Sequence, residues 1–528
     1  MQERKELLDI KEASIWATEF LGKSVTPSNI SYLINYGRIK KIGNNGGVYV
    51  EKNDLREYYR AYKNSREFVW KDKLGGDLNW ALSFEQYSES QTTKHVHRLH
   101  PYKGKFIPQL VEYFLDSHTD NFKKEVFFQR GDIVLDPFCG SGTTLVQANE
   151  LGIHAVGVDI SVFNAFLSNV KVQNVDFVDL TGQVNNISLA LRDFVRDGKH
   201  VAFEEKLLEF LNRYNSEFFP SPEFKIQARS KEINEYEYAR KHEAIVLEKF
   251  NELASKFEMK IKQDDQKRFI EKWYLQPIRE EIDFVFEKIK KVENAQTKRV
   301  LTIILSRTIR SCRATTHADL ATLVEPVVTT YYCAKHGKIC KPLFSIVSWW
   351  ERYCKDTFGR LKYFEKLKTD TNQICLNANS ENIDILAALK AKNPEFAALI
   401  RKQKIKGIFS SPPYVGLIDY HEQHAYAYDL FGFERQDEQE IGSMRKKQSK
   451  QAQAEYVKGI SNVLNNCRRY LAEDFDVFLV ANDKHNLYPQ IAENAGMKIV
   501  DQYKRPVLNR TEKDKQAYSE IIFHLKKK

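Results

Sequence analysis

The sequence has few cysteines and no long apolar run, and both shortages narrow the class of protein. Seven cysteines are scattered over 528 residues, so they do not form the dense set of a secreted disulfide scaffold. No apolar run approaches the roughly 20 residues of a membrane-spanning helix. Residues 2–5 are polar or charged, and the start of the chain lacks the apolar stretch of a signal peptide. We therefore expect a soluble, cytoplasmic protein with free thiols and no membrane partner.

The sequence also lacks an internal repeat, and it is too long for one compact domain. With 528 residues and 42% hydrophobic content, the chain can form two or three domains, each with its own core. Its formal net charge is +10. A basic chain suits a polyanionic partner such as nucleic acid, although many proteins without such a partner are equally basic.

Residues 8–62 predict a small unit that begins with two helices. Apolar residues at helical spacing indicate the first helix, namely Ile10, Ala13, Ala17, Phe20 and Leu21. Gly22 ends this helix. The second helix begins at residues 27–29, and its inner stripe consists of Ile30, Leu33 and Ile34.

Two short strands, 39–42 and 48–50, follow around a turn of residue types that tolerate positive φ, and a helix over 54–62 closes the unit. This arrangement resembles the winged helix-turn-helix of the excisionase and MerR type. The resemblance implies that the second helix enters the major groove and the wing contacts the DNA backbone. The residues expected to contact DNA are Ser28, Asn29, Ser31, Tyr32 and Arg38. Small three-helix units that bind no nucleic acid are the alternative.

From about residue 130 the pattern alternates between strand and helix. An apolar run at 133–135 leads into the turn 136–142, and a helix follows over 143–151. A second strand over 155–158 ends at Asp159. This order predicts a buried parallel strand that leads into a glycine-rich turn.

The alternation then stops and resumes only after a long interval. Residues 180 to about 300 carry apolar side chains at helical spacing, as at 203–214 and 282–289, which predicts a largely helical insertion. Strand-like segments return at 373–376, 405–409, 477–480, 498–502 and 520–524. These segments suffice to complete one mostly parallel sheet.

The glycine turn has the residues of a nucleoside site. Gly140 and Gly142 present no Cβ, so a ligand can approach the backbone closely. Asp159 lies about 20 residues further on, at the end of the second strand, where a carboxylate can accept hydrogen bonds from ribose hydroxyls. A structural turn or a dinucleotide site would explain the glycines alone nearly as well.

A second motif, Ser411-Pro412-Pro413-Tyr414, follows an apolar strand expected to be the fourth of the sheet. Two consecutive prolines fix φ and remove two backbone donors. The carbonyl of Pro412 can therefore point into a cleft beside the Ser411 hydroxyl, and the two acceptors can hold the protons of an exocyclic amine. Tyr414 would stack on a base rotated out of the duplex. An ordinary proline loop is the alternative.

Together, the two motifs resemble the amino-methyltransferase family of DNA modification enzymes. In that family an FxGxG-type loop binds S-adenosylmethionine, and an (Asp/Asn/Ser)-Pro-Pro-Tyr corner holds the target amine. Residues 100–108 resemble the segment that precedes the loop. The resemblance implies a Rossmann-like class I methyltransferase domain of the α/β class, interrupted by a mostly helical insertion and preceded by the winged helix-turn-helix.

The resemblance also implies boundaries and roles. It divides the chain into four parts. Residues 1–65 are the DNA-binding unit, and residues 85–180 are the cofactor part. Residues 181–370 are the insertion expected to recognise the target, and residues 371–528 are the catalytic part. The expected catalytic residues are Ser411, Pro412, Pro413 and Tyr414. The expected S-adenosylmethionine-binding residues are Lys105, Phe106, Asp136, Pro137, Phe138, Gly140, Gly142, Thr143, Asp159, Ile160 and Asn379. At Asn379 the family often has aspartate, and an amide can also bind an adenine edge.

The absence of a Pro-Cys dipeptide and the serine at position 411 bear on which atom of the base is methylated. Methylation at cytosine C5 needs a cysteine nucleophile in a Pro-Cys context, and no Pro-Cys dipeptide occurs. The serine at position 411 favours cytosine N4, as the serine-bearing family members imply, and adenine N6 is the alternative. Double-stranded DNA is the expected partner, in the cytoplasm of a prokaryote, within a restriction-modification or related defence system whose endonuclease is a separate chain.

Two other functional classes stay open. An RNA or protein methyltransferase can share the cofactor fold, because fold does not fix substrate. A DNA-binding regulator without catalysis would use the glycine turn only as structure.

Further DNA contacts are expected outside the amino-terminal unit. Arg307, Arg310 and Arg313 recur at three-residue spacing, which predicts one basic side of a helix. The basic run 445–450 includes Lys446 and Lys447, which we expect to contact the DNA backbone. Solvated basic surfaces are the alternative in both places.

Cys333, His336 and Cys340 have the short spacings of zinc ligands. They would form a structural zinc site if a fourth ligand came near, and the candidates are Cys312, His317 and Cys354. Free cysteines are the alternative, because no fourth ligand is local in sequence.

Overall fold

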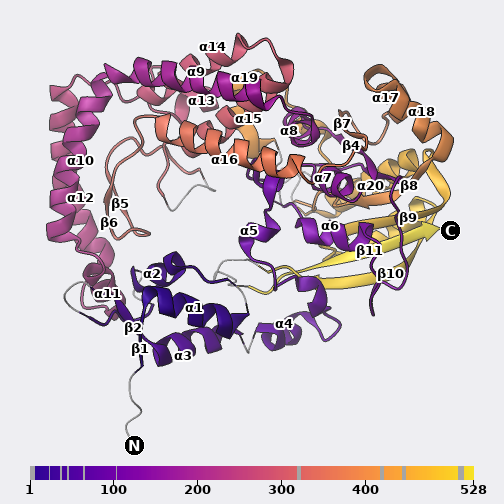
Figure 1. The fold of residues 1–528 in the computed structure, drawn as a ribbon, viewed down its shortest axis with the longest axis horizontal. Helices are drawn as coiled ribbons and strands as arrows, with labels where there is room; N and C mark the ends of the chain where they lie inside the picture. Colours follow the sequence, from indigo (N-terminus) through magenta and orange to yellow (C-terminus); the bar gives the residue numbers. More distant parts are fainter. Residues whose placement is uncertain are drawn as a thin grey trace, which may run out of the picture. The chain divides into compact units, whose positions relative to one another are not determined.

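The structure is a computed structural model in which the chain forms two compact units. Unit 1 consists of Met1–Val69, Gly182–Val292 and Thr308–Tyr353, and unit 2 consists of Trp70–Thr181, Glu293–Arg307 and Cys354–Lys528. Figure 1 shows the order of the elements along the chain. The structure describes residues 6–22, 24–35, 38–43, 47–63, 66–102, 104–317, 323–416, 421–442, 448–508 and 516–528. Lys446 and Lys447 lie outside the described residues, as do positions 44–46 of the expected turn.

Unit 2 contains a seven-stranded sheet with the strand order β10-β11-β9-β8-β3-β4-β7. Its strands are β3 (Ile133–Asp136), β4 (His154–Asp159), β7 (Gln373–Asn377), β8 (Ile405–Ser410), β9 (Leu471–Ala481), β10 (Met497–Pro506) and β11 (Ser519–Lys527). The neighbours from β7 to β9 pair in parallel, whereas β11 is antiparallel to both β9 and β10. The predicted mostly parallel sheet is confirmed.

The strand order reverses at β3, which lies between β4 and β8. In open parallel sheets a ligand cleft forms at the carboxyl ends of the strands where the order reverses. The pairing of Val134 with Gly407 and of Leu135 with Ile408 brings the ends of β3 and β8 side by side. The glycine turn follows the first of these strands and the Ser-Pro-Pro-Tyr corner follows the second.

Helices cover both faces of this sheet. On one face, α17 (Ile385–Lys392), α18 (Pro394–Gln403), α20 (Lys450–Arg468) and α21 (Tyr488–Asn494) share a large apolar core with the strands. On the other face lie α6 (Pro108–Leu115), α7 (Thr143–Glu150) and α8 (Val162–Val172). There Phe114 of α6 contacts the rings of Phe409 and Phe478 at centroid distances of 5.7 and 4.8 Å. Burial on both faces explains why the strands read as apolar runs.

The amino-terminal part of unit 1 forms its own small core. Its elements are β1 (Leu7–Asp9), α1 (Ile10–Leu21), α2 (Pro27–Asn35), β2 (Tyr49–Glu51) and α3 (Lys52–Lys63). The helices match the sequence expectation, and Gly22 ends α1 in the left-handed conformation. The predicted strand over 39–42 is wrong: Ile42 forms only an isolated bridge to Tyr49. Strand β2 pairs along its length with β1 instead.

The insertion is mostly helical, as predicted. It contains α9 (Phe177–Arg196), α10 (Lys199–Phe218), α11 (Glu223–Ser230), α12 (Glu235–Lys256), α13 (Phe269–Lys272), α14 (Gln276–Lys290), α15 (Ala295–Ser311) and α16 (Val347–Glu365). A hairpin of β5 (Tyr331–Cys333) and β6 (Lys338–Cys340) separates α15 from α16. Helices α9, α15 and α16 each continue from one unit into the other. Among the described residues, no helix is both long enough and apolar enough to cross a bilayer.

Replacing Gly407 tests the strand pairing on which the cleft depends. A Cβ at this buried position would lie 2.1 Å from the carbonyl oxygen of Asp476 on β9. We expect Gly407→Ala to lower the free energy of unfolding by about 1–3 kcal/mol or more, because two backbones must separate. The matched control is Gly359→Ala on α16, where a Cβ meets nothing within 4 Å. This control substitution should raise the free energy of unfolding by about 0.5–1 kcal/mol. Equal thermal midpoints for the two variants would contradict the pairing.

Candidate active site at the carboxyl edge of the sheet

One pocket in unit 2 collects residues from both sequence motifs. The space between its atoms, open solvent included, is about 830 Å³. The expected cofactor residues that line it are Lys105, Phe106, Pro137, Phe138, Gly140, Thr143, Asp159, Ile160 and Asn379. Ser411 and Pro413 of the corner also line it. Asp136, Gly142, Pro412 and Tyr414 are not among the residues that line it.

The glycine turn depends on positive φ and on close packing by the protein itself. Gly140 has φ of +51° and Gly142 has φ of +74°, both in the region that favours glycine. A Cβ on Gly140 would lie 3.0 Å from the hydroxyl of Tyr102, and a Cβ on Gly142 would lie 2.8 Å from Oγ of Ser168. Room for these neighbours is therefore a reason for the glycines in addition to the predicted approach of a ligand.

Asp159, at the end of β4, holds the glycine turn in place by hydrogen bonds. Its carboxylate accepts hydrogen bonds from the backbone N–H of Gly140 at 2.7 Å and of Ser161 at 2.8 Å, and from the Asn164 side chain at 3.1 Å. These donors use about three of the roughly four acceptor positions of a carboxylate. One further donor fits, fewer than the two ribose hydroxyls that the motif led us to expect.

Burial perturbs both carboxyl groups beneath the pocket. It raises the pKa of Asp159 to about 7, although the hydrogen bonds from Ser161 and Gly140 oppose this shift. It likewise raises the pKa of Asp136 to about 6. Asp136 accepts a hydrogen bond of 2.6 Å from the hydroxyl of Ser410. This bond connects the ends of β3 and β8.

The segment before the glycine turn contributes one wall of the pocket. Lys105 donates a hydrogen bond of 2.6 Å to the carbonyl of His97, and burial lowers the pKa of its ammonium group to about 8. Phe106 contacts Phe409 edge to face at 5.4 Å. This segment lines the same pocket as the glycine turn.

The corner after β8 is held by the two strands that follow it in the sheet. Ser411 donates its hydroxyl proton to the carbonyl of Val480 on β9 at 3.0 Å. Tyr414 donates a hydrogen bond of 2.7 Å to Glu520 on β11, and Arg505 pairs with the same carboxylate at 2.9 Å. Burial and the nearby Glu520 raise the pKa of Tyr414 well above its usual value. The phenol therefore stays protonated.

Several other lining residues were assigned no individual role from the sequence: Tyr102, Gly104, Cys139, Ser141, Ser161, Asn164, Ser380, Gln439, Glu440 and Ile441. Ser161 and Asn164 had a readable signal, because Ser161 caps α8 by accepting a hydrogen bond from the Asn164 N–H. Residues 439–441 carry no such signal. They reach the pocket only through the fold, where Glu440 accepts a hydrogen bond from the backbone N–H of His421.

The residues expected to contact DNA differ from one another in their exposure and in their hydrogen-bond partners. In the amino-terminal unit Ser28, Asn29, Tyr32 and Arg38 are exposed, and Ser31 is half-buried. The predicted row of arginines on one helix side is wrong. Arg307 is buried and bonded to Asp356 and Thr357, and Arg313 lies beyond the end of α15, where it is buried and bonded to the carbonyl of Arg310. Arg307 and Arg313 thus make hydrogen bonds within the protein in place of the expected phosphate contacts. Arg310 is half-buried.

The reversed strand order and the pocket at the strand ends fit the class I methyltransferase fold. Residues 32–164 match a family profile described as DNA methylase. The type II methyltransferase M.MjaII of Methanocaldococcus jannaschii is 45% identical over 533 residues, which cover 100% of this chain and 98% of that protein. The chain therefore belongs to the family of type II DNA methyltransferases, and DNA is its substrate.

Shorter similarities reach other methyltransferases. M.MvaI of Kocuria varians is 27% identical over 132 residues, which cover 25% of this chain and 28% of that protein. A tRNA (guanine(10)-N2)-dimethyltransferase of Methanocaldococcus jannaschii is 33% identical over 89 residues, which cover 17% of this chain and 21% of that protein. These matches are too short to transfer a substrate.

Family membership implies S-adenosylmethionine as the methyl donor, and the residues present fit it. The pocket combines apolar walls, such as Phe138 and Ile160, with the carboxylate of Asp159. Within the described part of the chain, the pocket residues Ser141 and Asn164 each have a buried polar atom, Oγ and Oδ1, without a hydrogen-bond partner. Unsatisfied buried polar groups of this kind are suited to a polar ligand.

The raised pKa of Asp159 predicts that cofactor binding depends on pH. The ionised carboxylate is the better acceptor for a ribose hydroxyl, and it becomes protonated as the pH falls through about 7. We expect S-adenosylmethionine to bind up to about tenfold more weakly at pH 6 than at pH 8, because the ionised fraction of Asp159 falls by about that factor. Asp159→Asn should bind weakly at both values, without this difference. Calorimetric titration measures both, and a wild-type affinity that is equal at the two pH values would exclude this role.

Proposed function

We propose that the protein is a site-specific DNA methyltransferase that methylates the exocyclic N4 amine of cytosine. The observation that supports an exocyclic amine as the target most directly is the hydrogen bond from Ser411 to the carbonyl of Val480. Because the hydroxyl proton is used there, the lone pairs of Ser411 Oγ remain to accept a proton from an amine. Ser411 lines the same pocket as the glycine turn. The serine at position 411, as in the serine-bearing family members, favours cytosine N4 over adenine N6.

The corner acts by holding the two amine protons. An exocyclic amine is planar because its lone pair is delocalised into the ring. Acceptance of its protons by Ser411 Oγ and by the Pro412 carbonyl would direct the lone pair out of that plane. Both acceptors are preorganised, since Ser411 is anchored to β9 and prolines fix the backbone on both sides. No covalent bond between enzyme and base is needed.

Tyr414 and its partners shape the base site. The ion pair of Glu520 with Arg505 and the hydrogen bond from Tyr414 fix the phenol ring. A fixed ring favours stacking against a base that has left the duplex. S-adenosylmethionine, when bound, supplies a methyl group activated by its positively charged sulfur.

Recognition of the target sequence is assigned to unit 1. We propose that residues 1–65 act as a winged helix-turn-helix, because α2 buries Ile30, Leu33 and Ile34 and exposes polar side chains along its other side. The insertion would supply further contacts to DNA. Arg310, Lys446 and Lys447 are proposed to contact the DNA backbone. The role in a restriction-modification or related defence system, with a separate endonuclease, rests on the family.

Adenine N6 is the alternative target, because the same two acceptors suit any exocyclic amine. The similarity to a tRNA (guanine(10)-N2)-dimethyltransferase makes RNA a substrate to compare. The amino-terminal unit favours duplex DNA over both RNA and a purely regulatory role, and S-adenosylmethionine binding separates an enzyme from a regulator.

Nucleoside analysis of methylated DNA tests the target atom. Duplex DNA, treated with the protein and S-adenosylmethionine and then digested, should yield N4-methylcytosine by mass spectrometry. N6-methyladenine alone would contradict the proposal, and methylation of RNA in preference to duplex DNA would contradict the substrate class.

Variants of the corner test the mechanism. Ser411→Ala should lower the turnover number by about 100-fold or more, because one preorganised partner of the amine is lost. Tyr414→Ala should have a similar effect, whereas Tyr414→Phe retains the ring and should lose less. The affinity for S-adenosylmethionine should stay unchanged in all three. The matched control is Ser461→Ala, which removes a buried hydroxyl that binds only Val457 within α20. Normal turnover of Ser411→Ala would refute the role of that hydroxyl.

A further inference from the structure

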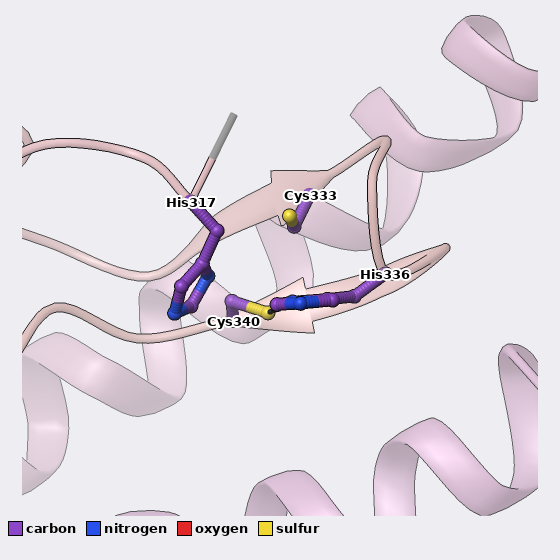
Figure 2. A group of neighbouring side chains, drawn as sticks. All are labelled: His317, Cys333, His336 and Cys340. Atoms are coloured by element: carbon purple, nitrogen blue, oxygen red, sulfur yellow. Dashed lines mark hydrogen bonds between the residues drawn. The ribbon is translucent and has the colours of Figure 1, made fainter. Parts of the chain in front are cut away.

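Four side chains of types that can bind a metal converge in unit 1. They are His317, Cys333, His336 and Cys340, and their candidate ligand atoms all lie within 4.8 Å of one another. Figure 2 shows that they come from three places: the hairpin strands β5 and β6, the turn between them, and the segment that carries His317. Of the three fourth ligands considered from the sequence, the fold selects His317. Cys312 and Cys354 are not part of the group.

The hairpin geometry places both cysteines on the same face. Tyr331 pairs with Cys340 and Cys333 pairs with Lys338. Since side chains alternate between the faces of a strand, Tyr331, Cys333 and Cys340 share one face. Gly337 has φ of +63° and closes the turn. The turn brings His336 next to Cys340, with Nδ1 3.5 Å from Sγ.

Two neighbouring helices, α10 and α12, hold the hairpin by hydrogen bonds to its backbone. Asn215 of α10 exchanges two hydrogen bonds with the backbone of Ile339, at 2.9 and 3.0 Å. Glu243 of α12 accepts a hydrogen bond of 2.6 Å from the N–H of Tyr332. These contacts leave the cysteine face to the segment that carries His317. There the Tyr331 hydroxyl lies 2.8 Å from Nδ1 of His317 and orients the ring, the kind of outer contact that positions metal-binding histidines.

The apolar cluster on the cysteine face of the hairpin is small. The cluster around the hairpin has only three buried members among the described residues, and two of these are Cys333 and Cys340. Small structural elements with so little apolar burial commonly depend on a metal or a disulfide. The cysteines are free thiols here.

We propose that His317, Cys333, His336 and Cys340 form a structural zinc site that joins the β5–β6 hairpin to the end of the α15 segment. Two thiolates and two imidazoles are a typical ligand set of tetrahedral zinc. Zinc–ligand bonds of about 2.0–2.3 Å imply ligand atoms about 3.3–3.8 Å apart. The observed separations thus need to shrink by only about 1 Å. Four protein ligands leave no open position for water, so the metal has a structural role and no catalytic one.

A second group with ligand types, His95, His97 and Glu150 in unit 2, differs in its surroundings. Glu150 there pairs with the ammonium of Lys94 at 2.7 Å. Lys105 and Lys171 also act on His97 electrostatically. A cationic environment opposes the binding of a metal ion. We therefore expect one zinc per chain.

Metal analysis of the whole protein tests the site. Protein purified without chelators should contain about one zinc per chain, and replacement by cobalt should give the visible absorption of a tetrahedral site with thiolate ligands. Cys340→Ser and His317→Ala should each weaken zinc binding by at least about 10-fold. The matched control is Cys312→Ala, a buried cysteine of the same unit outside the group, which should keep its zinc.

The readouts separate loss of the metal from loss of folding. Circular dichroism and S-adenosylmethionine binding of Cys340→Ser should show that unit 2 remains folded while zinc is lost. Wild-type protein that carries less than about a tenth of a zinc per chain after incubation with excess zinc and desalting would overturn the proposal. So would a folded Cys340→Ser variant with full zinc content, or equal zinc loss in Cys312→Ala.

Discussion

The parallel pairing of β3 with β8 is the constraint on which the rest of the active site depends. It brings together two turns that are about 270 residues apart in the chain, the glycine turn after Asp136 and the corner after Ser410. The hydrogen bond between Ser410 and Asp136 joins the strands at that edge. Since Gly407 leaves no room for a Cβ against β9, the same strand is fixed on its other side as well. The single pocket that residues of both turns line follows from this register.

The acceptor role that we propose for the corner depends on the use of its own protons elsewhere. Ser411 donates to β9 and Tyr414 donates to β11, so the antiparallel strand inserted between β9 and β10 helps to hold the corner. Asp159 has a comparable position under the cofactor loop, where it satisfies backbone donors of the turn that it supports. At the corner and under the cofactor loop, the side chains that we propose to bind a ligand also stabilise the local backbone.

The sequence predicted the elements that depend on local pattern and missed those that depend on long-range contacts. The parallel strands, the helical insertion and the membership of the pocket follow from apolar runs and two short motifs. Glu520, Arg505 and residues 439–441 carry no motif, and only the fold brings them to the site. The arginine row failed because spacing alone cannot show that Arg307 is buried and paired with Asp356. Three of the four cysteine and histidine ligands were visible from spacing, whereas the fold alone selected His317.

A structure of the protein with duplex DNA and an unreactive analogue of S-adenosylmethionine tests the central claim most directly. The account predicts a cytosine outside the helix, with its N4 within about 3.2 Å of both Ser411 Oγ and the Pro412 carbonyl. A target base still stacked in the duplex, or an exocyclic amine directed away from the corner after β8, would contradict it.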